Sequence, residues 1–503
     1  SARKNFRNEI YKDYKANRSD APDDLIPQFD FIRKSVMAFN LPSVELINYE
    51  ADDLIATYVE QILEKGAPDL PMKSTSIIIP DDKKMEVRVL NSVYTDYPNF
   101  NILPSKGNLS RLVNPETIPY EYGKSYIEDN FYPNNLVELR DPYILRDVRG
   151  TSVVYYPIQF NPVTNTLRVY SEISVEVYSN GEGILNVLDR ENAPVSRSME
   201  FQNIYNSHFE NNTNDLRFEY LVDHGNMLII SNQAFMATMN PLIEWKTLKG
   251  IPVEMVSVSE AGGNSNEIKN FVADYYHNQG LTFLLLVGDI AQVPSPSISG
   301  SLSDPSYGFI DGGDSYAEVI VGRFSGSTPS QIATQVERSI NYERYPNDGD
   351  WYSQAVGIAS NQGPGWGGQT DDVFNSQTLC PLLMDYNYDD CPVIADPSGT
   401  LTQGVNAINQ GRSIINYTGH GYQLGWSNGA PLGNNDVHGL TNSGMLPFVI
   451  TVGCNVGEFD AYDESFGEAW LRATHNGAPS GGIAHMGSTI SQSWEPPMHG
   501  QYG

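Results

Sequence analysis

The protein has 503 residues and a mass of 55.8 kDa, which is enough chain for about three domains. Its 31 Lys and Arg against 61 Asp and Glu give a formal net charge of -30, which disfavours binding to the phosphate backbone of nucleic acids. No apolar run reaches the roughly 18 residues of a membrane-spanning helix, and three cysteines exclude a disulfide-dense scaffold and leave at least one thiol outside any disulfide. The chain begins with SARK, without an initiator Met or an apolar export segment, so we expect that its start has been processed or cut.

The sequence predicts four segments in chain order. Residues 1–66 combine a basic and aromatic stretch with two helical patterns, the second of which ends at Gly66. Residues 67–185 consist of short alternating runs separated by Pro, Asn and Gly, which predicts a β-rich domain. Residues 186–217 are polar and rich in Asn, which indicates a linker. Residues 218–503 alternate apolar strands with helical segments, which predicts an α/β domain with a mostly parallel sheet flanked by helices.

Two apolar strands of the last domain run directly into residues with catalytic chemistry. One ends in SIINYTGHG, which carries His420 and Gly421, and the other in LPFVITVGC, which carries Cys454. Because ligands of open α/β sheets bind at the carboxyl ends of the strands, we expect these residues to lie at one edge. An imidazole activates a thiol as a nucleophile, and the N–H groups of Gly421 and Cys454 are candidates for an oxyanion hole. A buried structural cysteine and a loop histidine are the alternative, which these residues alone leave open.

The segments NYTGHG, LTNSGMLPFVITVGCNVGEFD and STISQSWEPPMHGQ resemble gingipains, which are cysteine endopeptidases with a caspase-like fold. VGDIAQVP, SDPSYGFIDGGDSYAEVIVGRF and INYER fit the same family, and the similarity covers about residues 218–503. The resemblance implies that Cys454 is the nucleophile and His420 the general base and acid. Arginine-specific gingipains carry a Glu that orients the histidine, and the matching residue here is Gln362. Its amide oxygen can still accept the imidazole N–H, and a solvated loop residue is the alternative.

The same resemblance places the substrate pocket. Asp371 matches the acid at the base of the specificity pocket of arginine-specific gingipains, and Trp494 and Met498 match the pocket walls. A buried carboxylate beside an aromatic wall suits a guanidinium group, so we expect cleavage after Arg, with Lys as the second option. Asp372 is adjacent to Asp371, and an acid at a helix N-terminus is the alternative for either residue.

The resemblance further implies a structural calcium ion. Clustered carboxylates and carbonyls suit Ca²⁺, which takes about six to eight oxygen ligands. The implied ligands are Asp289, Asp311, Asp314, Tyr316 and Glu318. Asp311 and Tyr316 are expected to contribute backbone oxygen, and acids in solvated turns are the alternative. Gln369 and Phe374 replace two ligands of a further family site, so a second calcium ion is not expected.

Residues 67–185 resemble the gingipain prodomain, above all in YYPIQFNPVTNTLRVYSEISVEVYS. Arg217 and Phe218 stand at the join with the catalytic region, where an enzyme that cleaves after Arg can remove its own prodomain; a chance Arg in a polar linker is the alternative. The resemblance implies a zymogen that is inhibited by its prodomain and is secreted or attached to the cell surface. Three arginines of the prodomain are candidates to fill the substrate pocket: Arg140, Arg146 and Arg149.

The first 66 residues resemble a different family. ARKNFRNEIYKDYKANR and YEADDLIATY are similar to the 5′-nuclease domain of DNA polymerase I, in which Glu50, Asp52 and Asp53 match metal-binding carboxylates. The segment lacks the other acids of that family, and an incomplete set does not hold two metal ions, so we expect no nuclease activity. The join near Gly66 is interpreted as a fusion, and the chain is expected to stop short of the family's full catalytic region.

The sequence thus favours a secreted, calcium-stabilised precursor of a cysteine endopeptidase that cleaves after Arg. A gingipain-like sortase, which passes the acyl group to an amine instead of water, is the related alternative. A nuclease fragment fused to an inactive peptidase-like scaffold is the alternative from another class.

Overall fold

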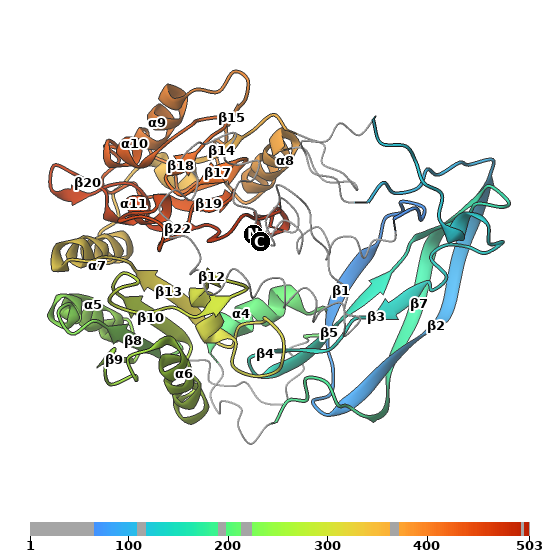
Figure 1. Cartoon of the computed structure of the whole chain (residues 1–503), viewed down its shortest axis with the longest axis horizontal. Coiled ribbons are helices and arrows are strands. Elements are labelled where there is room, and N and C mark those ends of the chain that lie inside the picture. The colour runs from blue at the N-terminus through green and yellow to red at the C-terminus, as the bar shows by residue number, and fades with distance from the viewer. Residues whose placement is uncertain are drawn as a thin grey trace, which may run out of the picture.

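The computed structural model of the chain describes residues 65–107, 117–189, 198–212, 224–362, 372–493 and 497–501. Figure 1 shows a β-rich N-terminal part beside two α/β units. No helix among these described residues is long and apolar enough to cross a membrane. The nuclease-like carboxylates Glu50, Asp52 and Asp53 lie outside the described residues.

Two antiparallel sheets form the N-terminal part, as the alternating pattern predicts. In one, β5 pairs with β1, β3 and β4, and in the other, β7 pairs with β2 and β6. The long ribbon of β2 and β7 shifts register at three points, and such irregularities bend and twist a ribbon. The elements of this part are β1 (Lys73–Ile78), β2 (Lys83–Pro98), η2 (Lys124–Tyr126), β3 (Val137–Leu139), β4 (Tyr143–Leu145), β5 (Val148–Tyr155), β6 (Ile158–Asn161) and β7 (Thr166–Glu182).

The segment predicted as a linker contains a helix, so that prediction is wrong for its described central part. Helix α4 (Met199–His208) begins after Ser198, whose side chain accepts the N–H of Phe201. Its buried Phe201 and Tyr205 pack with Tyr143 and Phe209 in one apolar cluster. The helix has only three turns and few apolar residues, so its periodicity is weak in the sequence and the packing decides its structure.

The first α/β sheet has the strand order β13-β10-β8-β9, and all its pairs are parallel. Its two central strands, β8 and β10, are mostly apolar runs, as expected for strands buried on both faces. Leu228 and Ile230 of β8 pack toward α6, whereas Ile229 packs toward α5 and α7. The elements of this unit are β8 (Met227–Ser231), α5 (Met236–Leu248), β9 (Val253–Ser257), α6 (Ser265–Gln279), β10 (Phe283–Val287), β11 (Ser297–Ile298), β12 (Ser301–Leu302), η3 (Asp304–Gly308), β13 (Ile320–Phe324) and α7 (Pro329–Arg344).

The second α/β sheet is also parallel and has the strand order β15-β14-β16-β19-β22. In its core the ring of Tyr417 stacks on Trp426 with centroids 4.5 Å apart, and Phe466 and Trp470 pack around them. The elements of this unit are η4 (Asp350–Ser353), β14 (Ala355–Ala359), α8 (Asp372–Asp385), β15 (Val393–Ala395), α9 (Leu401–Asn409), β16 (Ile414–Thr418), β17 (Gly421–Tyr422), β18 (Gly425–Trp426), α10 (Asn434–His438), β19 (Phe448–Val452), α11 (Phe466–Arg472), β20 (Thr474–His475), β21 (Ala478–Pro479), β22 (Ala484–Met486) and η5 (His499–Gln501).

Two buried arginines join the α/β units. Arg338 of α7 donates to the carbonyls of Trp470 and Ala473 at α11, and burial lowers the pKa of its guanidinium to about 9. Arg472 of α11 reaches back to Asp289, which follows β10. The domain predicted for residues 218–503 therefore consists of two parallel sheets that buried polar contacts hold together.

Candidate active site

The three residues predicted for catalysis follow three neighbouring strands. In the register of the sheet, Ala359 of β14 lies beside Thr418 of β16, which lies beside Val452 of β19. Gln362, His420 and Cys454 come two or three residues after these positions. Because the strands are parallel, all three emerge at the carboxyl edge of the second sheet, as predicted.

His420 and Gln362 are in contact. The Nε2 atom of His420 lies 2.8 Å from Oε1 of Gln362. An amide oxygen only accepts hydrogen bonds, so Nε2 carries the proton and Nδ1 is the nitrogen that can take up another. Gln362 is thus not a solvated loop residue, and the contact expected from the sequence is present.

A buried carboxylate supports Gln362. The backbone N–H of Gln362 donates to Ser360 Oγ at 3.1 Å, and the Ser360 hydroxyl donates to Asp372. The backbone N–H of Asp372 donates to the carbonyl of Gln362 at 3.2 Å. Asp372 is the first residue of α8 and is fully buried. Asp372 is therefore an acid at a helix N-terminus, and it helps to hold Gln362, the residue that contacts His420.

Gly421 lies directly against Cys454. A Cβ at position 421 would stand 2.7 Å from the carbonyl oxygen of Cys454 and 3.2 Å from its nitrogen, so only glycine fits there without a shift. Cys454 is half-buried, and its Sγ lies 3.6 Å from the carbonyl of Gln492. The two N–H groups considered for an oxyanion hole therefore belong to backbone segments in contact.

The turn that carries Cys454 is tied to the segment after β22. Asn455 has a left-handed backbone with φ of 59°, and its N–H donates to the carbonyl of Ile490. The side chain of Gln492 donates to the carbonyl of Gly453 at 3.2 Å. The segment that precedes the expected pocket wall thus runs along the candidate nucleophile.

The expected pocket residues are only partly described. Met498 is described and is 1% exposed, so it packs inside the protein. Asp371 and Trp494 lie outside the described residues, as do Arg217 and Phe218 at the predicted activation site.

Sequence reasoning missed the polar groups that fix the backbone of His420. Asn428 accepts the N–H of His420 at 2.9 Å, and the hydroxyl of Tyr417 donates to the His420 carbonyl at 2.6 Å. Gln501 accepts from Asn375 at 2.7 Å and donates to the carbonyl of Tyr417, which connects the last described residues to the end of β16. These contacts join segments that lie far apart along the chain, so no local sequence motif predicts them.

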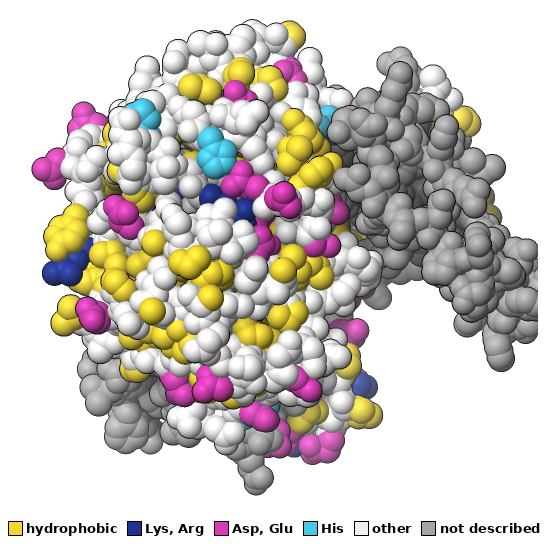
Figure 2. Space-filling view, turned by 60° about the vertical axis from the view of Figure 1, so that its left-hand side comes forward, with side chains coloured by type: hydrophobic (Ala, Val, Ile, Leu, Met, Phe, Trp, Pro, Cys, Tyr) yellow, Lys and Arg dark blue, Asp and Glu magenta, His cyan; other side chains and the backbone are white. Residues whose placement is uncertain are grey.

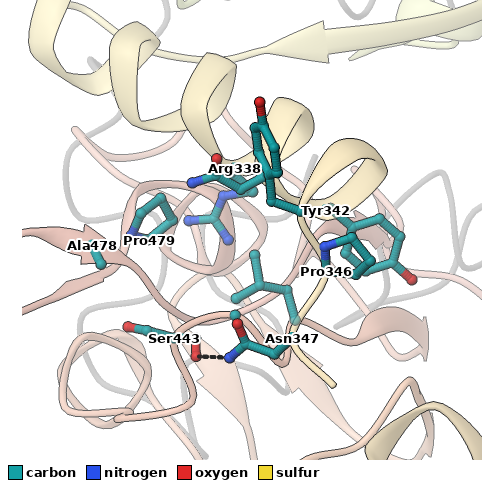
Figure 3. Close-up of a pocket in the computed structure, with 11 residues that line it drawn as sticks. Arg338, Tyr342, Pro346, Asn347, Ser443, Ala478 and Pro479 are labelled. Carbon is teal, nitrogen blue, oxygen red and sulfur yellow. Dashed lines mark hydrogen bonds between the residues drawn. The ribbon is translucent and has the colours of Figure 1, made fainter. Parts of the chain in front are cut away.

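A cavity of about 320 Å³ lies at the opposite edge of the second sheet (Figure 3). Its lining includes Asn347, which precedes β14, and Leu446, which precedes β19. Because these residues stand at the amino ends of the strands, the cavity is separate from the edge that carries Cys454.

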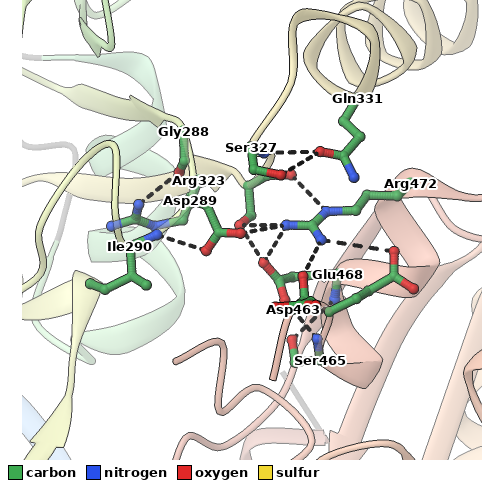
Figure 4. Close-up of polar contacts among 12 residues, drawn as sticks. Gly288, Asp289, Ile290, Arg323, Ser327, Gln331, Asp463, Ser465, Glu468 and Arg472 are labelled. Atoms are coloured by element: carbon green, nitrogen blue, oxygen red, sulfur yellow. Dashed lines mark hydrogen bonds and ion pairs between the residues drawn. The ribbon is translucent and has the colours of Figure 1, made fainter. Parts of the chain in front are cut away.

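Asp289, one of the expected calcium ligands, lies in a network of charges (Figure 4). Its Oδ2 accepts from Arg472 at 3.0 Å, and Arg472 also pairs with Glu468 at 2.6 Å. The buried Glu468 accepts from the hydroxyl of Ser325, and burial raises the pKa of its carboxyl. Asp289 thus joins the two α/β units. Figure 2 shows how acidic side chains, in magenta, are distributed over one face of the molecule.

The remaining expected ligands lie around another loop. Asp311 accepts from His277 at 3.0 Å, and Asp314 accepts from the N–H of Ile144 and from its own loop at Tyr316. Glu318 is fully buried, which raises the pKa of its carboxyl to about 8, and its Oε1 lacks a hydrogen-bond partner.

Within the described ranges, no group of three or more His, Cys, Asp or Glu side chains is arranged to hold a metal ion. Asp289 pairs with Arg472, and both carboxylate oxygens of Asp314 accept N–H donors, so the calcium site stays a prediction.

Two of the three candidate inhibitory arginines lie elsewhere than the catalytic edge. Arg146 is buried against the first α/β sheet, and Arg149 donates to carbonyls of its own part, among them that of Asn186. Arg140 is exposed and pairs with Glu138. The prediction that Arg146 or Arg149 fills the substrate pocket is therefore wrong.

Cys380 and Cys391 form a disulfide between α8 and the segment before β15. Cys454 is the cysteine that remains outside it, as the odd number requires.

The fold and the site define a class of protein, a cysteine peptidase of parallel α/β architecture with a β-rich part before it. The model for Peptidase family C25 matches residues 221–501, more than half of the chain, and the Propeptide_C25 model matches residues 32–209. The chain therefore belongs to peptidase family C25 and includes the propeptide of that family.

Named relatives agree with this assignment. Gingipain R2 of Porphyromonas gingivalis is 37% identical over 480 residues, which cover 93% of this chain and 65% of the relative. The complex of Porphyromonas gingivalis RgpB pro- and mature domains matches with 36% identity and a TM-score of 0.53, over 55% of this chain and 67% of that one. The crystal structure of the Arg specific cysteine proteinase gingipain R matches with 36% identity and a TM-score of 0.53, over 55% and 65%. The chain thus spans about two thirds of the length of these relatives.

The propeptide match is longer than the β-rich domain expected from the sequence. It begins at residue 32, inside the segment set apart as nuclease-like, and ends at residue 209, after α4. Helix α4 and the β-rich sheets thus fall within one propeptide match.

Proposed function

We propose that the chain is the precursor of a secreted cysteine endopeptidase that cleaves after Arg, with Lys as a weaker second. The observation that carries the proposal is the meeting of three strand ends at one edge. There Gln362 holds His420 at 2.8 Å, and Gly421 packs against the backbone of Cys454. Membership of peptidase family C25 supports the same chemistry.

The proposed reaction uses the residues at this edge in two steps. The thiol proton of Cys454 passes to Nδ1 of His420, and the sulfur forms a bond to the carbonyl carbon of the substrate. The oxyanion accepts from the N–H groups of Gly421 and Cys454. As the C–N bond breaks, the imidazolium gives its proton to the leaving amine, and a thioester remains.

In the second step water replaces the sulfur. His420 takes a proton from the water, whose oxygen bonds to the thioester carbon. The C–S bond then breaks, the acid product leaves, and the thiolate regains its proton. Gln362 accepts from Nε2 throughout and keeps Nδ1 as the nitrogen that exchanges protons.

The preference for Arg is supported by the relatives, among them a proteinase described as Arg specific. The predicted base of the pocket is Asp371. Asp371→Asn should lower kcat/KM for an Arg substrate by roughly 30-fold or more, because a charged hydrogen bond to the guanidinium is lost. An unchanged kcat/KM for the Arg substrate would remove Asp371 from this role.

The N-terminal part is proposed to inhibit the enzyme until cleavage between Arg217 and Phe218. The propeptide match and the similarity to the RgpB complex support the N-terminal part as a binding partner of the catalytic part. Arg217→Ala should leave the two parts in one chain when the purified protein is incubated, whereas the unmodified chain is cut. Secretion is supported by the disulfide, since disulfides persist mainly in oxidising compartments.

The decisive test of the proposed function is Cys454→Ala. After trypsin has removed the N-terminal part, this variant should lose turnover of an Arg anilide by roughly a thousandfold or more. The matched control replaces Cys380 and Cys391 together by Ala and should keep activity. Unchanged turnover in Cys454→Ala, or no labelling of Cys454 by a peptidyl-Arg chloromethyl ketone, would end the proposal. Products that carry an added amine, seen by mass spectrometry, would instead indicate transpeptidation.

A further inference from the structure

Arg146, in the turn between β4 and β5, is buried in the first α/β unit rather than in its own part. Its side chain is 1% exposed. Nη1 donates to the carbonyls of Leu281 at 2.6 Å and Glu318 at 2.8 Å. Nη2 donates to the carbonyl of Gly280 at 3.0 Å and to the hydroxyl of Thr282 at 3.3 Å.

Two aromatic rings complete the site. The guanidinium carbon of Arg146 lies 5.4 Å from the ring centroid of Tyr276 and 4.6 Å from that of Phe201. The Tyr276 hydroxyl also donates to the Arg146 carbonyl at 3.3 Å. The guanidinium group of Arg presents several N–H donors in one plane and can bind several carbonyls at once, whereas the ammonium group of Lys cannot. The four acceptors and two rings around Arg146, called the cage below, are therefore expected to bind Arg better than Lys.

The backbone at Arg146 is adapted to this insertion. Its φ is 56°, in the left-handed region that non-glycine residues rarely adopt. The next residue, Asp147, accepts from the hydroxyl of Tyr205 on α4, which holds the turn from behind. The turn thus presents one side chain, and that side chain enters the neighbouring part.

The rim of the cage binds the same turn. The N–H of Ile144 donates to Asp314 at 2.9 Å, and the rings of Tyr143 and Tyr316 stack with centroids 3.9 Å apart. The side chain of Asn186 also contacts this loop, at the N–H of Gly313 and at Asp314. The loop expected to bind calcium therefore serves as a docking surface for the N-terminal part.

The cage is separate from the candidate active site. Gly280, Leu281 and Thr282 precede β10, and Glu318 precedes β13, so the acceptors stand at the amino edge of the first sheet. The candidate catalytic residues stand at the carboxyl edge of the second sheet. All four acceptors and Tyr276 lie after residue 217, so a cut at Arg217 leaves them on the catalytic part.

We propose that the catalytic part carries a second arginine-binding pocket, formed by Gly280, Leu281, Thr282, Glu318 and Tyr276. In the precursor it is filled by Arg146 and anchors the N-terminal part. Once that part has left, the pocket accepts an arginine side chain of another polypeptide. Only this last step rests on the proposed activation of the enzyme.

The test uses the full chain with Cys454→Ala, so that no outcome depends on catalysis. A recognition sequence for a specific protease is inserted between residues 212 and 224, the chain is cut, and the dissociation constant of the two fragments is measured by surface plasmon resonance. Arg146→Ala should weaken the complex by roughly 30-fold or more, because a buried and hydrogen-bonded charge is lost. Arg146→Lys should weaken it by about tenfold. The control Arg140→Ala, at an exposed arginine of the same part, should change it less than about twofold.

Two further measurements separate a specific pocket from a damaged fold. Ethylguanidinium should tighten the complex of Arg146→Ala and leave the unmodified complex unchanged, whereas ethylammonium should have no effect. A peptide of residues 144–148 should displace the N-terminal fragment from the cut chain, and the same peptide with Arg146→Ala should not. Affinity of the Arg146→Ala chain within about threefold of the parent, or equal displacement by the two peptides, would overturn the proposal.

Discussion

Removal of the amide that holds His420 tests the candidate active site most directly. In Gln362→Ala the 2.8 Å contact between Nε2 and Oε1 is lost. A hydrogen bond to a charged group contributes about 1.5–3 kcal/mol, and this contact strengthens when the imidazole becomes imidazolium during the reaction. Since about 1.4 kcal/mol corresponds to a factor of ten, kcat should fall by roughly 10- to 100-fold with a smaller change in KM.

The assay is steady-state turnover of an Arg anilide over a range of pH after trypsin removal of the N-terminal part. Gln362→Glu should retain or increase kcat and shift the acid limb of the pH profile to higher pH, because a carboxylate stabilises imidazolium and so raises the pKa of the histidine that acts as the base. Ser360→Ala, which loosens Gln362 without touching the imidazole, should lower kcat less. Gln403→Ala, on the exposed side of α9, is the matched control. A kcat of Gln362→Ala within about twofold of the parent would refute the assigned orientation of the histidine.

Three further predictions concern stability. Arg472→Ala removes the cation that pairs with the buried Glu468 and should lower the free energy of unfolding by about 3–5 kcal/mol in urea titrations. A loss below about 1 kcal/mol would contradict the joining role of Arg472. A hydrogen bond to Glu464 raises the pKa of His438, so the folded protein is stabilised below the ordinary histidine pKa, and this stabilisation is lost as pH rises through the raised pKa. His438→Gln should therefore lower the melting temperature at about pH 5.5 and leave it unchanged at about pH 9. An equal effect at both pH values would contradict this prediction. Because Asp314 is engaged by the N-terminal part, added calcium should leave the melting temperature of the uncut chain unchanged, and a rise of several degrees would show that the expected ligand set assembles.

Predictions from local sequence succeeded where a short apolar strand ends in a reactive residue. The runs before His420 and Cys454 predict buried parallel strands, and parallel strands bring their carboxyl ends to one edge. Gln362 was found by the resemblance and obeys the same rule, since it follows the strand AVGIAS. Local sequence did not show contacts between residues that lie far apart along the chain. The resemblance groups the acids from Asp289 to Glu318 as one set, and nothing near Asp289 in the sequence indicates its contact with Arg472, 183 positions away.

The sequence by itself determined the parallel α/β domain, the β-rich part before it and the edge at which the thiol and the imidazole stand, because hydrophobic periodicity and strand order are local properties. Only the tertiary structure decided what the charged side chains do. The sequence does not show which residues Arg146, Asp314 and Arg472 contact, and a buried charge is tolerated only where packing supplies donors or acceptors for it. Those partners come from segments that meet only when the sheets have formed.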